Sequence, residues 1–139
     1  MDAVLVDSNV ILDVFESDPH WLEWSTTVLE RLSASHRLVI NPVIYAEVSI
    51  GFVHIEELED ALRAGRFVLE ETPREALFLA GKAFLAYRRR RGPRASPLPD
   101  FFIGAHAAVR GLPLLTRDST RYRSYFPRVR VIDPTTSGA

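Results

Sequence analysis

The stretch AVLVDSNVILDVF, residues 3–15, decides the fold because one kind of secondary structure runs directly into another within it. Residues 3–7 form a short apolar run that is rich in β-formers and ends in Asp7. From residue 8 to residue 16 the apolar residues recur at helical spacing, behind Ser8 and Asn9, which are both common helix caps. We therefore predict a buried strand that leads into a helix, with an acid at the junction.

The same alternation of short apolar runs and helical periods continues along the chain. Further strands are predicted at residues 37–40, 66–70, 112–118 and 129–133, and helices at residues 21–34, 41–52, 55–65, 73–91 and 99–111. Pro42 at the start of one helix and Gly111 at the end of another fit these boundaries. The alternation predicts an α/β protein with a parallel sheet covered on both faces. We expect one domain over residues 1–139, with residues 129–133 as an edge strand and a frayed tail from about residue 135.

Composition excludes several classes of protein. The chain has 139 residues, of which 47% are hydrophobic, and it contains no cysteine, so disulfides, thiolate nucleophiles and cysteine-bound zinc are excluded. Its first residues, MDAVLVDSNVILDVF, are interrupted by acids and predict neither a signal peptide nor a membrane span. We therefore expect a cytoplasmic protein with no membrane association.

Charge is balanced over the whole chain but not along it. The formal net charge is −1, which gives no global argument for a nucleic-acid partner. Five arginines nevertheless crowd into RRRRGPRASPLP, residues 88–99, namely Arg88, Arg89, Arg90, Arg91 and Arg94. This basic stretch could bind a polyanion, or it could be an ordinary solvated face and the basic end of a helix.

Four acids stand at positions where a ligand site could form. Ligands of open parallel sheets bind outside the carboxyl ends of the strands. Asp7 ends the first predicted strand and Asp118 ends the fourth, so the two acids share one edge if those strands are neighbours. Asp100 begins the helix that leads into the fourth strand, and Glu47 lies in an apolar helix after the second. Sequence alone leaves open whether the four converge.

Convergence of these acids would require a cation. Two carboxylates about 5 Å apart repel each other by roughly 3 kcal/mol at an effective dielectric constant near 20. A hard divalent cation cancels this repulsion, and oxygen ligands without cysteine favour Mg²⁺ or Mn²⁺ over zinc. Such ions commonly serve phosphate substrates. An acidic site, a divalent metal and a phosphodiester substrate therefore belong to one hypothesis.

Four segments of the chain resemble, in order and spacing, the four motifs of PIN-domain proteins, in particular the VapC toxins of bacterial toxin–antitoxin pairs. The segments are VLVDSNVILDVF, NPVIYAEV, LPDFFIGAHA and LLTRDSTRYRSYFP. The resemblance implies a three-layer α/β/α fold with a short central parallel sheet. It also implies a homodimeric, Mg²⁺- or Mn²⁺-dependent endoribonuclease, inhibited by a small antitoxin whose C-terminal segment enters the acidic groove.

The resemblance also assigns roles to residues. Asp7, Glu47, Asp100 and Asp118 become the catalytic acids, with Asp7, Asp100 and Asp118 as metal ligands and Glu47 bound directly or through water. Thr116 matches a hydroxyl residue that steadies the site, and Ser8 and Asn9 flank the first acid. The expected reaction is RNA hydrolysis that leaves a 5′-phosphate and a 3′-hydroxyl. The basic stretch before the third motif is less typical of the family, and binding of flanking phosphates by the arginines of residues 88–94 is a separate hypothesis.

Two other protein classes and several other residues fit the sequence less well than this hypothesis. An aspartyl-phosphate hydrolase needs a second acid where Asn9 stands, and a phospho-receiver domain needs paired acids after the first strand. The alternative that keeps the fold is a non-catalytic PIN-like module that binds RNA or a protein. Outside the four acids we expect His106 to be a packing or polar partner, Asp13 to face away from the site, and Asp133 to be a strand-end residue. Core or dimer-interface positions are expected for the aromatic residues Trp21, Trp24, Phe101 and Phe102.

Overall fold

A five-stranded parallel sheet forms the centre of the computed structural model, which describes residues 2–91 and 98–136. The strands are β1 (Asp2–Val6), β2 (His36–Ile40), β3 (Phe67–Leu69), β4 (Leu114–Leu115) and β5 (Val131–Ile132), in the order β3-β2-β1-β4-β5. Leu5 of β1 pairs with Val39 on one side and with Leu114 on the other. Because β1 and β4 are neighbours, their carboxyl ends lie at the same edge of the sheet, as expected.

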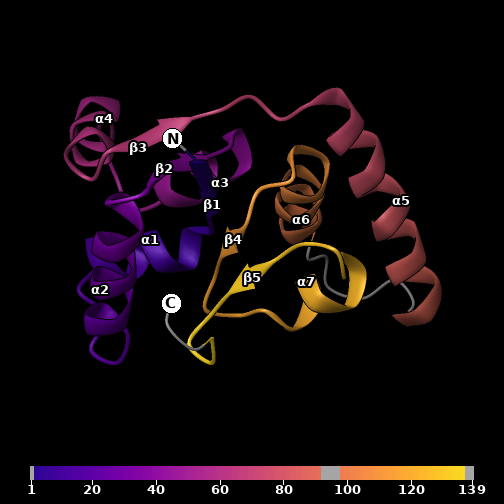
Figure 1. Cartoon of the computed structure of the whole chain (residues 1–139). Coiled ribbons are helices and arrows are strands. Elements are labelled where there is room, and N and C mark those ends of the chain that lie inside the picture. The colour runs from indigo at the N-terminus through magenta and orange to yellow at the C-terminus, as the bar shows by residue number, and fades with distance from the viewer. Residues whose placement is uncertain (1, 92–97, 137–139) are drawn as a thin grey trace.

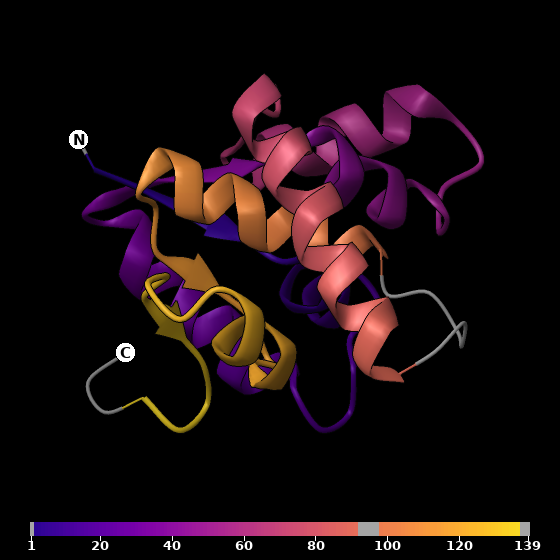
Figure 2. The same cartoon turned by 90° about the vertical axis from the view of Figure 1, so that its right-hand side faces the viewer.

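Helices cover both faces of the sheet (Figure 1). They are α1 (Ser8–Phe15), α2 (Leu22–Ser33), α3 (Pro42–Ser49), α4 (Ile55–Ala64), α5 (Arg74–Arg91), α6 (Leu98–Arg110) and α7 (Thr120–Tyr125). In Figure 1, α1 and α2 lie to one side of the strands and α6 to the other, with α5 outermost. Figure 2 shows α5 crossing α6 on the side that faces away from the sheet. The α/β fold with helices on both faces of a short parallel sheet is confirmed.

The central strand is apolar along most of its length because both of its faces are covered. Residues 3–6 are all buried, and three of them are completely inaccessible to solvent. Parallel sheets of this kind have nearly continuous apolar strands rather than alternating ones. The sequence run that predicted the fold is thus the middle of the core. In the described part of the chain, no helix is both long and apolar enough to cross a membrane.

Several elements differ from the sequence prediction; β5 is shorter than the predicted residues 129–133, and α3 ends at Ser49 rather than at residue 52. The fourth strand is limited to Leu114–Leu115, because Pro113 has no N–H to donate and the chain turns away after Thr116. Helix α7, six residues long, was not predicted, since only Tyr122 of its residues is buried and no apolar period marks it. Arg88–Arg91 belong to the last turn of α5, and Arg94 lies outside the described residues.

Aromatic packing fixes α7 against α5 and α6. Phe101 of α6 is fully buried and contacts the rings of Phe84 and Tyr87 from α5, and of Tyr125 and Phe126 at the end of α7. Gly104 allows this approach, because a Cβ atom there would lie 2.4 Å from the Phe126 ring. This cluster holds α7 beside the carboxyl ends of β1 and β4.

Candidate active site

Asp7 lies at the junction of β1 and α1, where it caps the helix. Its Oδ1 accepts a hydrogen bond from the backbone N–H of Ser8 at 2.7 Å. Its Oδ2 accepts the hydroxyls of Thr116 at 2.8 Å and Tyr122 at 2.9 Å. The side chain is buried, and all of these donors are neutral. The fold therefore holds the Asp7 carboxylate in a fixed orientation without supplying a positive charge to these two oxygens.

The surroundings of Asp7 raise its pKa to about 6 from an ordinary value of 3.8. Burial is the largest cause, because it disfavours the charged carboxylate. The hydrogen bonds from Thr116 and Tyr122 lower the pKa, whereas the negative charges of Asp100 and Glu47 raise it further. Asp7 thus lies within the electrostatic reach of two of the other predicted acids.

Glu47 joins this group from α3. The Ser8 hydroxyl donates to Glu47 Oε1 at 2.9 Å, so the residue after Asp7 ties the two acids together. Partial burial raises the pKa of Glu47, and the charge of Asp100 adds to the effect. The apolar helix in which Glu47 stands therefore turns this acid toward the site rather than toward solvent.

Asp100, in the first turn of α6, has a cationic partner. Arg121 of α7 forms an ion pair with Asp100 Oδ2, and the Tyr122 hydroxyl lies 3.4 Å from Oδ1. Burial nevertheless raises the pKa of Asp100, assisted by the charge of Asp118, while the contacts with Arg121 and Tyr122 lower it. Tyr122 bridges Asp7 and Asp100, with the shorter bond to Asp7.

Asp118 stands at the exposed edge of the cluster. Its backbone N–H donates to Thr116 Oγ1 at 3.2 Å, and its charge acts on Asp100. Asn9 fixes the same turn, since its amide donates to Thr116 Oγ1 at 3.2 Å and its Oδ1 accepts from the Arg117 N–H at 3.2 Å. Ser8, Asn9 and Thr116 therefore contact the predicted acids or the turn that carries Asp118, and their supporting role stays a prediction.

The acids share one region without forming a compact ligand set. Among residues 2–91 and 98–136, no three acid or histidine side chains stand close enough together to hold a metal ion as they are placed. Asp100 is engaged by Arg121, and Asp118 is exposed. The donor chemistry suits a hard divalent cation, because every candidate is a carboxylate and the three hydrogen-bond donors to Asp7 are neutral.

The sequence did not predict Arg121 and Tyr122 as residues of this region. Both belong to the unpredicted helix α7. Tyr122 lies four positions after Asp118, which is one helical turn, but this spacing indicates nothing by itself. Their contacts with Asp7 and Asp100 depend on how α7 packs against α6.

Asp13, Asp133 and His106, which the sequence places outside the site, each have polar partners. Asp13 is buried and accepts two hydrogen bonds from Arg117, at 2.8 and 2.9 Å, and one from Ser25. Asp133 follows β5 and is bound by Arg123, Thr135 and Thr136. The buried His106 lies 2.7 Å from Glu70 Oε2 and 3.3 Å from the Asn41 amide. The predictions of a polar partner for His106 and a strand end for Asp133 are confirmed.

The aromatic residues follow two patterns. Phe101 is core, as predicted, and Phe102 is half-buried. Trp21 packs edge-on against Trp24 and under the Arg117 guanidinium, at 5.3 Å from its ring centre. None of these four residues contributes a hydrogen bond or an ion pair to the acids described above.

Solved structures with the same fold come from toxin–antitoxin complexes. A chain of VapBC2 from Rickettsia felis, crystallised with a DNA fragment from its promoter, is 16% identical, with a TM-score of 0.71 over 94% of this chain and 98% of that one. A chain of VapBC-1 from nontypeable Haemophilus influenzae is 20% identical, with a TM-score of 0.69 over 96% and 99%. A chain of a toxin–antitoxin complex from Klebsiella pneumoniae is 21% identical, with a TM-score of 0.66 over 95% of this chain and 98% of that one. At these identities the likeness establishes a shared fold.

Comparisons of sequence give one negative and one positive result. No curated protein matches the chain. The family model of the PIN domain matches residues 4–127, which run from within β1 to just past α7 and contain all four predicted acids. The chain therefore belongs to the PIN domain family.

Proposed function

We propose that this protein is a Mg²⁺- or Mn²⁺-dependent endoribonuclease, the VapC-type toxin of a toxin–antitoxin pair. The observation that carries the proposal is the buried Asp7 carboxylate, whose hydrogen-bond donors are all neutral and whose neighbours include Glu47 and Asp100. A fold that keeps such a group pays for it in stability, and perturbed acids of this kind gather at functional sites. Family membership and the fold shared with toxin–antitoxin complexes support the same activity.

Asp7, Asp100 and Asp118 would hold the cation, with Glu47 binding it directly or through water. When bound, a divalent cation supplies charge neutralisation at the phosphate and lowers the pKa of a water molecule. The chain itself orients the acids. The Ser8 N–H, Thr116 and Tyr122 fix both oxygens of Asp7, and the Ser8 hydroxyl holds Glu47. Asp100 must exchange Arg121 for the cation.

Positive charge for the RNA backbone would come from the end of α5. Arg88, Arg89 and Arg90 are exposed on its last turns. Arg88 and Arg90 lie over the rings of Phe84 and Tyr125, at 5.9 and 5.6 Å from their centres. Exposed arginines that neutralise phosphates raise affinity for any RNA sequence and make it dependent on salt.

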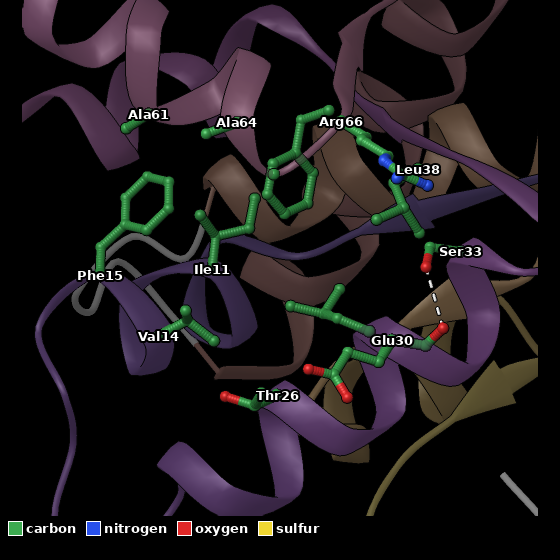
Figure 3. A pocket seen from close by; sticks show the side chains of 13 residues that line it. Ile11, Val14, Phe15, Thr26, Glu30, Ser33, Leu38, Ala61, Ala64 and Arg66 are labelled. Atoms are coloured by element: carbon green, nitrogen blue, oxygen red, sulfur yellow. Dashed lines mark hydrogen bonds between the residues drawn. The ribbon is translucent and has the colours of Figure 1, made fainter.

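The proposed binding site for an inhibitory protein partner lies among α1, α2 and α4, away from the end of α5. A cavity of about 740 Å³ lies between α1, α2 and α4. Figure 3 shows Ile11, Val14 and Phe15 of α1 on one side of it, with Ala61 and Ala64 of α4 on another. We assign this largely apolar groove to an amphipathic segment of the antitoxin, which then continues toward the acids. Structures with the same fold come from toxin–antitoxin complexes, which supports a protein partner of this kind. A homodimer in the cytoplasm remains part of the proposal.

Cleavage of a labelled single-stranded RNA panel by the purified, antitoxin-free protein tests the activity. Reactions contain Mg²⁺, Mn²⁺ or EDTA, beside an Asp7→Asn variant. We expect fragments with 5′-phosphate ends that disappear in EDTA and in the variant. RNA that is bound but never cut in any metal would instead identify the non-catalytic PIN-like module.

A further inference from the structure

A second hollow lies beside the acids, between the end of α5 and α7. Its volume is about 280 Å³, and it is lined by Tyr87, Asp118, Thr120, Arg121, Ser124 and Tyr125. It shares Asp118 and Arg121 with the acidic site, so a group bound there would touch the edge of the cluster. Figure 2 shows the two helices that form it on the same side of the molecule.

The tyrosines form a supported aromatic wall. Tyr87 and Tyr125 are half-buried, with ring centres 5.9 Å apart, and both rest on the fully buried Phe101, at 5.5 and 5.3 Å. Side chains packed on such a floor keep their orientation without a ligand, so binding a flat group against them costs little conformational entropy.

Cations stand over the same two rings. The Arg121 guanidinium lies 5.8 Å from the centre of the Tyr87 ring, and the Arg90 guanidinium lies 5.6 Å from that of Tyr125. Arg90 is exposed, and the Arg121 side chain is 35% exposed. Aromatic faces with adjacent cations match a nucleotide, whose base stacks while its phosphate is neutralised.

We propose that this hollow is a nucleotide subsite, which takes the nucleotide next to the scissile phosphate of single-stranded RNA. The base stacks on the face of one tyrosine ring and meets the edge of the other, because the Tyr87 and Tyr125 rings are inclined at 68° to each other. Arg90 and Arg121 neutralise the flanking phosphate. The volume lies just below the range of about 300–1,000 Å³ for small-molecule sites, which suits one nucleotide. This subsite rests on the proposed nuclease function and adds substrate-positioning residues to it.

The experiment separates stacking from cleavage. Affinity for a labelled single-stranded RNA is measured by fluorescence anisotropy in the Asp7→Asn background, where the RNA stays intact. Stacking contributes about 1–3 kcal/mol per base, so replacing both tyrosines by leucine should weaken binding by about 5-fold to 150-fold. Leucine keeps apolar contact with Phe101, and thermal unfolding checks that the variant folds. Tryptophan at either position should preserve the affinity.

A matched control exists on the same helix. Phe78 of α5 is exposed, and the Lys82 ammonium lies 5.1 Å from its ring centre, so it is the same kind of pair outside the hollow. Phe78→Leu should leave RNA affinity unchanged. In the cleaving protein, Tyr87→Leu with Tyr125→Leu should raise KM and leave kcat nearly constant.

The outcomes distinguish this proposal from the nuclease itself. Cleavage by the wild type, with unchanged RNA affinity in the double leucine variant, would overturn the subsite and leave the nuclease standing. Lost affinity without any cleavage in the wild type would overturn the nuclease and the placement beside a scissile phosphate, and would leave the hollow as a nucleotide-binding site. If the double variant bound RNA normally and lost its protein partner instead, the hollow would belong to that partner and the proposal would be wrong.

Discussion

Asp7 and Asp13 are two buried acids at the same helix, yet the molecule treats them differently. Their exposed fractions are 4% and 2%. Asp13 receives a guanidinium through two hydrogen bonds from Arg117, together with the Ser25 hydroxyl. Asp7 accepts hydrogen bonds from the Ser8 N–H and from two hydroxyls, and it lies near the negative charges of other carboxylates. The two acids are therefore about equally buried, but Asp13 has a positively charged neighbour whereas Asp7 has negatively charged ones.

The difference indicates which acids serve the fold. A buried charge is costly unless it is paired, and removing its partner is strongly destabilising. The fold supplies a counter-charge to Asp13 from Arg117 and to Asp133 from Arg123, and the pKa of Asp133 is held well below its usual range by its hydrogen bonds. Asp7 lacks such a partner, so we infer that its counter-charge comes from outside the chain.

The largest expected effect is the loss of cleavage in Asp7→Asn. Asparagine keeps the shape of the cap but removes the charge that would bind the cation, so we expect the rate to fall by at least about 1,000-fold, or about 4 kcal/mol in the barrier. The measurement is single-turnover RNA cleavage. Asp133→Asn, a change at a paired acid, should leave the rate of folded protein close to that of the wild type. Equal losses in both variants would erase the distinction between the two kinds of acid.

The next effect is a pH dependence of stability that is specific to Asp7. Its pKa is about 6 in the folded state and 3.8 in the reference state. Between these pH values the folded chain keeps a proton that the unfolded chain has released, so stability falls as pH rises. The free energy of unfolding should drop by about 2 kcal/mol more in the wild type than in Asp7→Asn between about pH 4 and pH 7. Urea denaturation at each pH measures this free energy. If it changed with pH by the same amount in the two proteins, the raised pKa would be contradicted.

Asp13→Asn should destabilise the fold. Arg117 would keep a partly buried guanidinium without its carboxylate, at a cost of about 2 kcal/mol, reduced from the fully buried case because the Arg117 side chain is 28% exposed. Urea denaturation at neutral pH measures the change. If Asp13→Asn were as stable as the wild type while Asp7→Asn was less stable, the roles assigned to these acids would be reversed.

The smallest effect is expected for Arg123→Ala. The Arg123 side chain is 53% exposed, and Asp133 keeps hydrogen bonds from Thr135 and Thr136, so the loss should be less than about 1 kcal/mol. Thermal unfolding at low and high salt checks this value. A loss as large as that of Asp13→Asn would mean that exposure does not weaken these pairs as argued.

Local sequence patterns predicted much of the fold and part of the site. The strand-to-helix junction at Asp7 and the unusual acid in an apolar helix, Glu47, were both visible in the sequence. The counter-charges were not, since Arg117 lies 104 residues from Asp13 along the chain. Arg121 and Tyr122 were missed for a related reason. The short helix that carries them is placed by packing of Phe126 against Gly104, which no periodic pattern encodes.

The central claim is that the acids around Asp7 bind a divalent cation as their missing counter-charge. Titration of Mn²⁺ into metal-free protein at neutral pH, followed by isothermal calorimetry, tests it most directly. The wild type is compared with Asp7→Asn and with Asp133→Asn. We predict Mn²⁺ binding by the wild type and Asp133→Asn, and none by Asp7→Asn. No binding by the wild type, or equal binding by all three proteins, would contradict the account.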